Sequence, residues 1–166
     1  DPDRTQMTLR ILDIVRSKIG APYRWGAAGP SRFDCSGLII WALIQLGVRL
    51  SARFTAAMFW NRCSRVAVPA PGRLCYWRNR AGRIFHVAVV SRVEGAHFWA
   101  IGAHGGGPTT TTDDAARQQG AQVFEKRFKV ALAAGFTMLP GEAQPRELPD
   151  EPEPGEESGD PPEDWV

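Results

Sequence analysis

Apolar residues in the first third of the chain recur at helical spacing. Between residues 5 and 19 they share one face of a helix, with Arg and Lys opposite, at Met7, Ile11, Leu12, Ile14, Val15 and Ile19. This pattern predicts an amphipathic helix that packs against a core and ends at Gly20. A denser apolar run predicts a second helix over 36–46 with Gly47 as its C-terminal signal, and residues 52–63 predict a third, shorter helix.

The second half of the chain changes to short apolar runs separated by turn residues. These runs predict strands at 74–77, 84–90, 97–104 and 121–127, and the glycines and threonines over 105–112 predict a loop. Because the connections between these strands are too short for crossover helices, we expect an antiparallel sheet. Helices followed by closely spaced strands predict an α+β fold.

Charge divides the chain of 166 residues into two parts. The first 140 residues carry nineteen basic and eight acidic side chains, whereas residues 141–166 carry ten acidic side chains, one Arg and six of the thirteen prolines. We therefore expect a folded domain over 1–140 and an acidic, Pro-rich, disordered tail over 141–166. The tail is either a solvating segment, or an acidic peptide that docks on a protein partner through Trp165 or folds back on the basic domain.

Composition argues against several classes of protein. The longest apolar run, Leu38 to Leu46, is far shorter than the roughly 20 residues of a membrane span. The chain begins Asp1-Pro2-Asp3, so no signal peptide is visible in it. The arginines are scattered rather than clustered among aromatic residues, which argues against nucleic acid and suits another anionic polymer such as the cell wall.

The chain has three cysteines, Cys35, Cys63 and Cys75, an odd number without C-x-x-C spacing. This argues against a disulfide scaffold and against a zinc site. A Cys63–Cys75 bridge and buried free thiols both fit the sequence. We expect no metal ion and no organic cofactor.

Cys35 stands where a polar loop rich in Gly and Pro meets the central apolar run. Backbone N–H groups in the first turn of a helix have no intrahelical partner, and the helix dipole favours negative charge there. A thiol in that place is pushed toward thiolate, its nucleophilic form. A nucleophilic thiolate needs a base, for which His86, within an apolar strand, is a candidate; a structural core histidine is the alternative.

Five segments resemble, in order and spacing, the NlpC-type family of bacterial cell-wall cysteine peptidases. They are Gly-Ala-Pro-Tyr-Arg-Trp-Gly at 20–26, Phe-Asp-Cys-Ser-Gly-Leu at 33–38, Pro-Gly-Arg-Leu at 71–74, His-Val-Ala-Val-Val at 86–90 and Ile-Gly-Ala at 101–103. The resemblance implies a papain-like fold, in which N-terminal helices that carry the nucleophilic Cys pack on a small antiparallel sheet that carries the His. It also implies hydrolysis of amide bonds in peptidoglycan stem peptides, typically between D-glutamate and a diamino acid.

The same resemblance assigns roles to individual residues. Cys35 attacks the scissile carbonyl as a thiolate, and His86 takes the thiol proton and returns it to the leaving amine. The backbone N–H of Cys35, helped by the hydroxyl of Tyr23, stabilises the oxyanion. Tyr23, Asp34 and Ser36 match positions that line the substrate cleft, where Asp34 meets an ammonium group of the stem peptide. Helix capping is the alternative role for Asp34 and Ser36.

The sequence departs from the family's pattern in three places, one of which concerns the catalytic residues. The residue that orients the catalytic His is commonly a His or another polar residue just before Ala on the return strand, and this chain has Gly102 there. His104 lies two residues further on, on the same face of the strand, so we expect it to be the third catalytic residue. The alternatives are His97, which points to the opposite face, a backbone carbonyl, or water.

The resemblance therefore implies a thiol peptidase that acts on peptidoglycan in the cell wall or periplasm. The glycines after Ala103, followed by threonines, resemble phage-associated members, which would place the protein on a phage-like particle with a phage-tail partner. Two other hypotheses keep the fold. One is a non-catalytic module that binds the wall or builds a phage tail, and the other is a Cys-His amidase or acyltransferase on another substrate.

Overall fold

The structure is a computed structural model that describes residues 2–141, so the predicted acidic tail lies, apart from Gly141, outside the described residues. Its helices are α1 (Pro2–Arg16), α2 (Cys35–Gln45), α3 (Ala56–Arg62), α4 (Asp113–Gln119) and the short 3-10 helix η1 (Val130–Leu132). Its strands are β1 (Arg65–Val66), β2 (Leu74–Arg78), β3 (Ile84–Glu94), β4 (His97–His104), β5 (Gln122–Lys129) and β6 (Gly135–Thr137).

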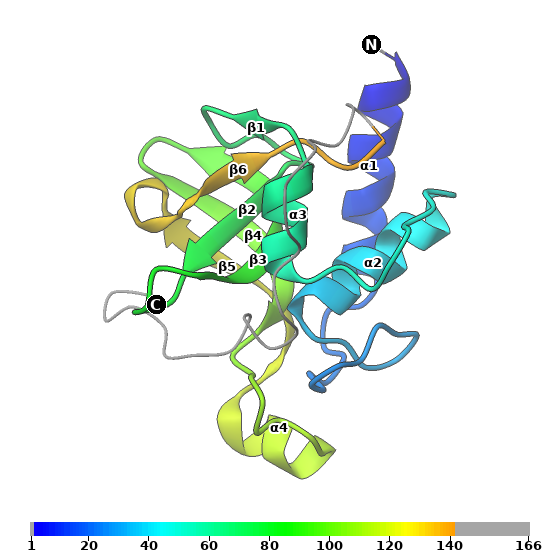
Figure 1. Cartoon of the computed structure of the whole chain (residues 1–166), viewed down its shortest axis with the longest axis vertical. Coiled ribbons are helices and arrows are strands. Elements are labelled where there is room, and N and C mark those ends of the chain that lie inside the picture. The colour runs from blue at the N-terminus through cyan, green and yellow to red at the C-terminus, as the bar shows by residue number, and fades with distance from the viewer. Residues whose placement is uncertain (1, 142–166) are drawn as a thin grey trace.

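Within residues 2–141, the strands form one six-stranded sheet in the order β1-β6-β2-β3-β4-β5. All of its strand pairs are antiparallel. The helices α1 and α2 lie together beside the sheet, α3 lies across it, and α4 projects from the β4–β5 connection at one end of the molecule (Figure 1). The predicted α+β fold with an antiparallel sheet is therefore confirmed.

The two faces of the sheet have separate apolar cores. The helix-side core joins the helices to the sheet and includes Leu38, Leu43, Phe59, Val87 and Ile101. The outer-face cluster consists of Cys75, Trp77, Ala88, Val90, Phe98, Ala100, Phe128 and Phe136. Side chains alternate between the two cores along β3 because successive residues of a strand point to opposite faces. The first eight residues of β3 are therefore almost all buried, as its apolar sequence predicts.

The helix α4 follows the predicted glycine and threonine loop and was not expected from the sequence pattern. It is capped at both ends, because the Thr112 hydroxyl accepts a hydrogen bond from the N–H of Ala115 and Gly120 adopts a left-handed conformation at φ 65°. It has seven residues, of which Ala116 is buried, so it shows no apolar periodicity. The strands β1 and β6, of two and three residues, are also too short to show a pattern.

Other boundaries differ from the predictions by a few residues. The third helix begins at Ala56 rather than 52, because Thr55 caps it by accepting a hydrogen bond from the N–H of Met58.

The three cysteines are buried and form no disulfide, so the alternative of a Cys63–Cys75 bridge is wrong. Among the helices of the described part of the chain, none is long and apolar enough to cross a bilayer.

Candidate active site

The helix α2 begins at Cys35, and Asp34 caps it. The carboxylate of Asp34 accepts hydrogen bonds from the backbone N–H of Gly37 at 2.7 Å and of Gly26 at 2.9 Å. Cys35 is therefore held in the first helical turn, where backbone N–H groups have no intrahelical acceptor and favour negative charge. The predicted position of the thiol at a helix start is confirmed.

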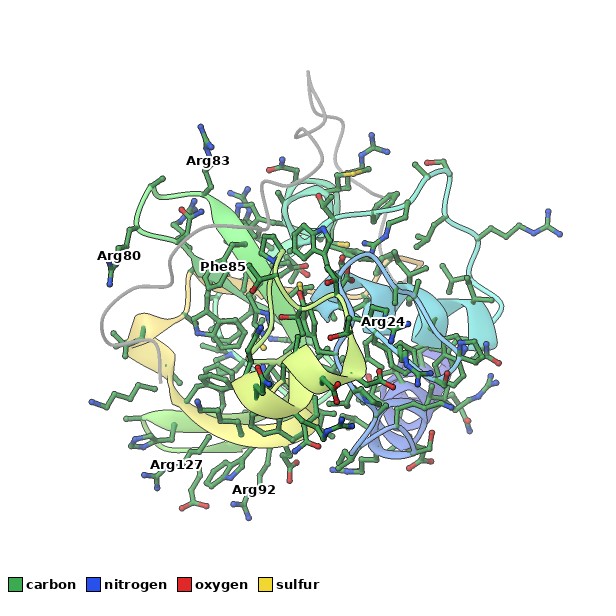
Figure 2. The ribbon with its side chains drawn as sticks, turned by 90° about the horizontal axis from the view of Figure 1, so that it is seen from below. Arg24, Arg80, Arg83, Phe85, Arg92 and Arg127 are labelled. Atoms are coloured by element: carbon green, nitrogen blue, oxygen red, sulfur yellow. The ribbon has the colours of Figure 1, made fainter. Side chains whose placement is uncertain are left out.

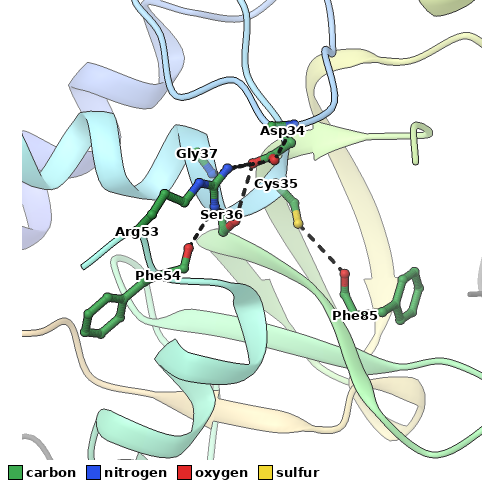
Figure 3. Close-up of polar contacts among 8 residues, drawn as sticks. Asp34, Cys35, Ser36, Gly37, Arg53, Phe54 and Phe85 are labelled. Atoms are coloured by element: carbon green, nitrogen blue, oxygen red, sulfur yellow. Dashed lines mark hydrogen bonds and ion pairs between the residues drawn. The ribbon is translucent and has the colours of Figure 1, made fainter. Parts of the chain in front are cut away.

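The Cys35 thiol points from α2 toward β3. Its side chain is buried, and Sγ lies 3.8 Å from the carbonyl oxygen of Phe85, to which the thiol donates a weak hydrogen bond (Figure 3). Phe85 directly precedes His86 in β3. The fold thus brings a thiol from the helix layer and the backbone next to the predicted base to one place, although they lie about fifty residues apart in sequence.

His86 and His104 form a buried pair on neighbouring strands. Nε2 of His86 lies 2.9 Å from Nδ1 of His104, and both side chains are almost fully buried. Trp77 of β2 stacks at a tilt against His86, with ring centroids 5.3 Å apart. His97 lies at the opposite end of β4, where it pairs with Glu94, so it is not part of this cluster.

The carbonyl of Ala100 determines which nitrogens of this pair carry protons. Nε2 of His104 lies 3.3 Å from that oxygen, and because a carbonyl only accepts, Nε2 must be protonated. In a neutral imidazole the other nitrogen, Nδ1, is then an acceptor, so Nε2 of His86 donates to it. Nδ1 of His86 consequently carries the lone pair that can accept a proton from a thiol.

Burial keeps both imidazoles neutral. It lowers the pKa of His86 well below its usual value, and electrostatic interactions with His104 and Lys126 lower that pKa further. Burial also lowers the pKa of His104 to about 4; its hydrogen bond to Ala100 opposes this effect, whereas the charge of Lys126 adds to it. Lys126 is opposite Ala100 on β5. At neutral pH the resting pair is therefore uncharged and can act as a base.

Arg53 binds the two residues on either side of Cys35, and the sequence pattern did not identify it. Its guanidinium lies 2.7 Å from both carboxylate oxygens of Asp34 and 2.5 Å from Oγ of Ser36, and it donates to the carbonyl of Phe54 (Figure 3). Ser36 is fully buried and Asp34 nearly so. The capping alternative is thus observed for Asp34, and its contact with a substrate ammonium stays a prediction.

Tyr23 is buried beside the segment that carries the nucleophile. It forms a bridge with Phe33, and its ring packs so closely on Gly106 that a Cβ at that glycine would lie 2.4 Å from it. The loop after β4 therefore needs a glycine at this point. The structure places Tyr23 between this loop and the Cys35 turn, and the role of its hydroxyl stays a prediction.

A second group of residues that the sequence did not reveal fastens α4 to the loop before α2. Asp113 accepts hydrogen bonds from Arg32 at 2.6 and 2.8 Å and from Arg24 at 3.0 Å. These hydrogen bonds and charges lower the pKa of Asp113 to about 2. Figure 2 shows Arg24 close to α4. The contact joins segments about eighty residues apart, so no local signal could have revealed it.

A cavity, but no metal-binding cluster, is found in the part of the chain that the structure describes. Within the described residues, no group of three or more His, Cys, Asp or Glu side chains could hold a metal ion. A cavity of about 460 Å³ lies between α4 and the segment 20–22, and its lining includes Asp113 and Arg117 but none of the three candidate catalytic residues.

Two bacterial relatives resemble short parts of this chain. A probable endopeptidase of Corynebacterium glutamicum is 62% identical over 37 residues, which are 22% of this chain and 18% of that protein. The probable endopeptidase p60 of Listeria grayi is 37% identical over 76 residues, which are 45% of this chain and 14% of that protein. This chain thus matches less than a fifth of the length of either relative.

Solved structures resemble most of the chain. The NlpC/p60 domain of the peptidoglycan hydrolase SagA is 25% identical with a TM-score of 0.54, and the match covers 78% of this chain and 97% of that one. The peptidoglycan hydrolase RipB of Mycobacterium tuberculosis is 20% identical with a TM-score of 0.58, over 83% of this chain and 66% of that one. These matches confirm the predicted papain-like α+β fold.

All five segments that resemble the family lie in the part of the chain that a family model matches. The model described as the NlpC/P60 family matches residues 20–123, which is more than half of the chain. This span includes the Cys35 turn and both strands that carry the buried histidines. The chain therefore belongs to the NlpC/P60 family.

Proposed function

We propose that the protein is a cysteine endopeptidase that hydrolyses amide bonds in peptidoglycan stem peptides. The bond between D-glutamate and a diamino acid is the expected target. The observation that carries the proposal is the thiol of Cys35, at a helix start, next to the backbone of His86, whose ring is in turn hydrogen-bonded to His104. Family membership and the peptidoglycan hydrolases among its structural neighbours support the substrate class.

The proposed mechanism follows from the tautomers of the histidine pair. Nδ1 of His86 accepts the proton of Cys35, and the thiolate attacks the scissile carbonyl carbon. The oxyanion develops beside the backbone N–H of Cys35, and one such donor is typically worth about 3 kcal/mol. The protonated His86 gives its proton to the leaving amine, and then takes one from the water molecule that hydrolyses the thioester. His104 keeps the ring of His86 oriented throughout.

The surface charge of the domain suits this substrate. The first 140 residues carry eleven more basic than acidic side chains, nineteen against eight. Arg80 and Arg83 extend from the turn between β2 and β3, and Arg92 and Arg127 from another side of the sheet (Figure 2). A polymer with free carboxylates is attracted to such a surface, and the attraction weakens with salt.

The test is the release of peptide fragments from purified peptidoglycan, with the products identified by mass spectrometry. Wild-type protein should release fragments, and Cys35→Ala should release none while its circular dichroism stays unchanged. Cys63→Ala is the matched control, because Cys63 is also a buried free thiol but lies at the end of α3. Equal release by the wild type and by Cys35→Ala would refute the proposal, and the product masses identify the bond.

The two alternative functions give different results in the same experiments. A non-catalytic wall-binding module would sediment with peptidoglycan, but its Cys35 would react with iodoacetamide at pH 6 no faster than a free thiol. An amidase or acyltransferase would show rapid alkylation without release from peptidoglycan, and would act on other amides or esters. The proposed endopeptidase requires both rapid alkylation and fragment release.

The proposed place of action is the cell wall. The relatives named above support it through the peptidoglycan hydrolases among them. None of their names mentions a phage, so a phage-like particle and a phage-tail partner stay predictions of the sequence. The acidic tail that would carry such a partner lies outside the described residues.

A further inference from the structure

A β-bulge determines which residue of β4 faces His86. The pairing of β3 with β4 shifts by one residue between Val90 and Arg92. A shift of one residue moves every later side chain to the other face of the sheet. Continued from the pair Val90–Ala100 toward the start of β3, the shifted register sets His86 opposite His104. Without the bulge the two rings would lie on opposite faces.

Gly102 leaves the space that the ring of His104 occupies. A Cβ at this glycine would lie 3.0 Å from Cε1 and 3.2 Å from Nε2 of His104, and 2.8 Å from the Cβ of Ala88. Phe124 is opposite Gly102 on β5, and its ring centroid is 4.9 Å from that of His104. The imidazole is thus enclosed between strands, and a side chain at position 102 would displace it.

We propose that Gly102 is a positioning residue for His86 and acts through His104. The ring that lies over Gly102 reaches the carbonyl of Ala100 with Nε2 and His86 with Nδ1. One enclosed space therefore fixes the position of His104 and the tautomer of the pair together. The catalytic consequence rests on the proposed function, whereas the geometry of the pair does not.

The variants Gly102→Ala, Ala88→Gly and their combination test the proposal. Ala88→Gly removes the contact between the strands but leaves the contact with the ring of His104, so the double variant separates packing from positioning. We expect Gly102→Ala and the double variant to lower kcat for fragment release roughly 10- to 100-fold, the range for partners that orient an imidazole, with KM nearly unchanged. Ala88→Gly alone should keep wild-type kcat. A double variant with wild-type kcat would refute the proposal.

Nitrogen-15 NMR of the imidazoles tests the same proposal without a substrate. In the wild type, Nε2 of His104 should be protonated and Nδ1 unprotonated, and the double variant should lose this preference for one tautomer. Alkylation of Cys35 at pH 6 should slow at least tenfold in the double variant, in parallel with the NMR change. A wild-type His104 protonated at Nδ1 would overturn the inference even if no variant folds.

These readouts also separate the two proposals. If the wild type releases no fragment, but the tautomers and the slowed alkylation are found, then the endopeptidase function fails and the role of Gly102 stands. If fragments are released normally by the double variant, the role of Gly102 fails and the endopeptidase function stands.

Discussion

The buried pair of neutral imidazoles should make the folded domain sensitive to mild acid. The pKa of His104 falls from 6.5 to about 4 on folding. Between these pH values His104 is therefore mostly protonated in the unfolded chain and mostly neutral in the folded chain. The free energy of unfolding is therefore highest above pH 6.5 and decreases as the pH falls toward 4. Proton linkage then gives a loss from His104 alone of about 1.3 kcal/mol between pH 7.5 and 5.5, and about 2.5 kcal/mol by pH 4.5. His86, whose pKa is also lowered by burial, adds to the loss.

Urea unfolding at pH 7.5 and 5.5 measures this effect. In His104→Gln the amide oxygen can still accept from Nε2 of His86 but does not titrate, so the variant should lose about 1.3 kcal/mol less than the wild type between the two pH values. His97→Gln, a substitution at the other end of β4, is the control and should keep the wild-type difference. Equal losses in the wild type and in His104→Gln would refute the reasoning, because they would mean that His104 is not buried in its neutral form.

Three further substitutions test other contacts. Lys126→Met removes a charge that lowers the pKa of His86, so the acid limb of the pH–alkylation profile should move to higher pH. Arg53→Met leaves the buried carboxylate of Asp34 without its ion pair and should cost about 1–3 kcal/mol in urea unfolding, partly recovered by Arg53→Lys. Asp113→Asn weakens the contacts with Arg24 and Arg32 that fasten α4 to the loop before α2, so it should speed amide hydrogen exchange over 105–120; unchanged exchange would count against this role of Asp113.

Local signals were sufficient to predict the position of the candidate nucleophile and the general architecture. The start of α2 could be predicted at Asp34 and Cys35 because a capping residue followed by an apolar run marks a helix start. His104 could be predicted because a strand places every second residue on one face, and Gly102 marked that face. These signals depend on residues that are close together in the sequence, so they can be recognised from one sequence alone.

The remaining parts of the site depend on contacts that no local pattern encodes. The bulge after Val90, which sets His86 opposite His104, depends on how two strands pair. Arg53 lies in a connection between helices, and its partner Asp34 is known only once that connection folds back on α2. Asp113 binds Arg24 and Arg32 of the loop before α2, and it lies in α4, a helix too short to show apolar periodicity. Sequence reasoning therefore identified the candidate reacting groups, which the structure brings close together, and missed the residues that hold them.

The division of the sheet into two cores has a consequence for the geometry of the candidate site. Cys35 belongs to the helix-side core, whereas the rings of His86 and His104 contact Trp77 and Phe128 of the outer-face cluster. The candidate nucleophile and base are thus anchored in different cores, and the thiol contacts β3 at the carbonyl of Phe85. A movement of α2 relative to the sheet would therefore move the thiol of Cys35 away from β3 and leave the hydrogen bond between His86 and His104 in place. The rate at which an alkylating reagent modifies Cys35 should accordingly report on the position of α2 relative to the sheet.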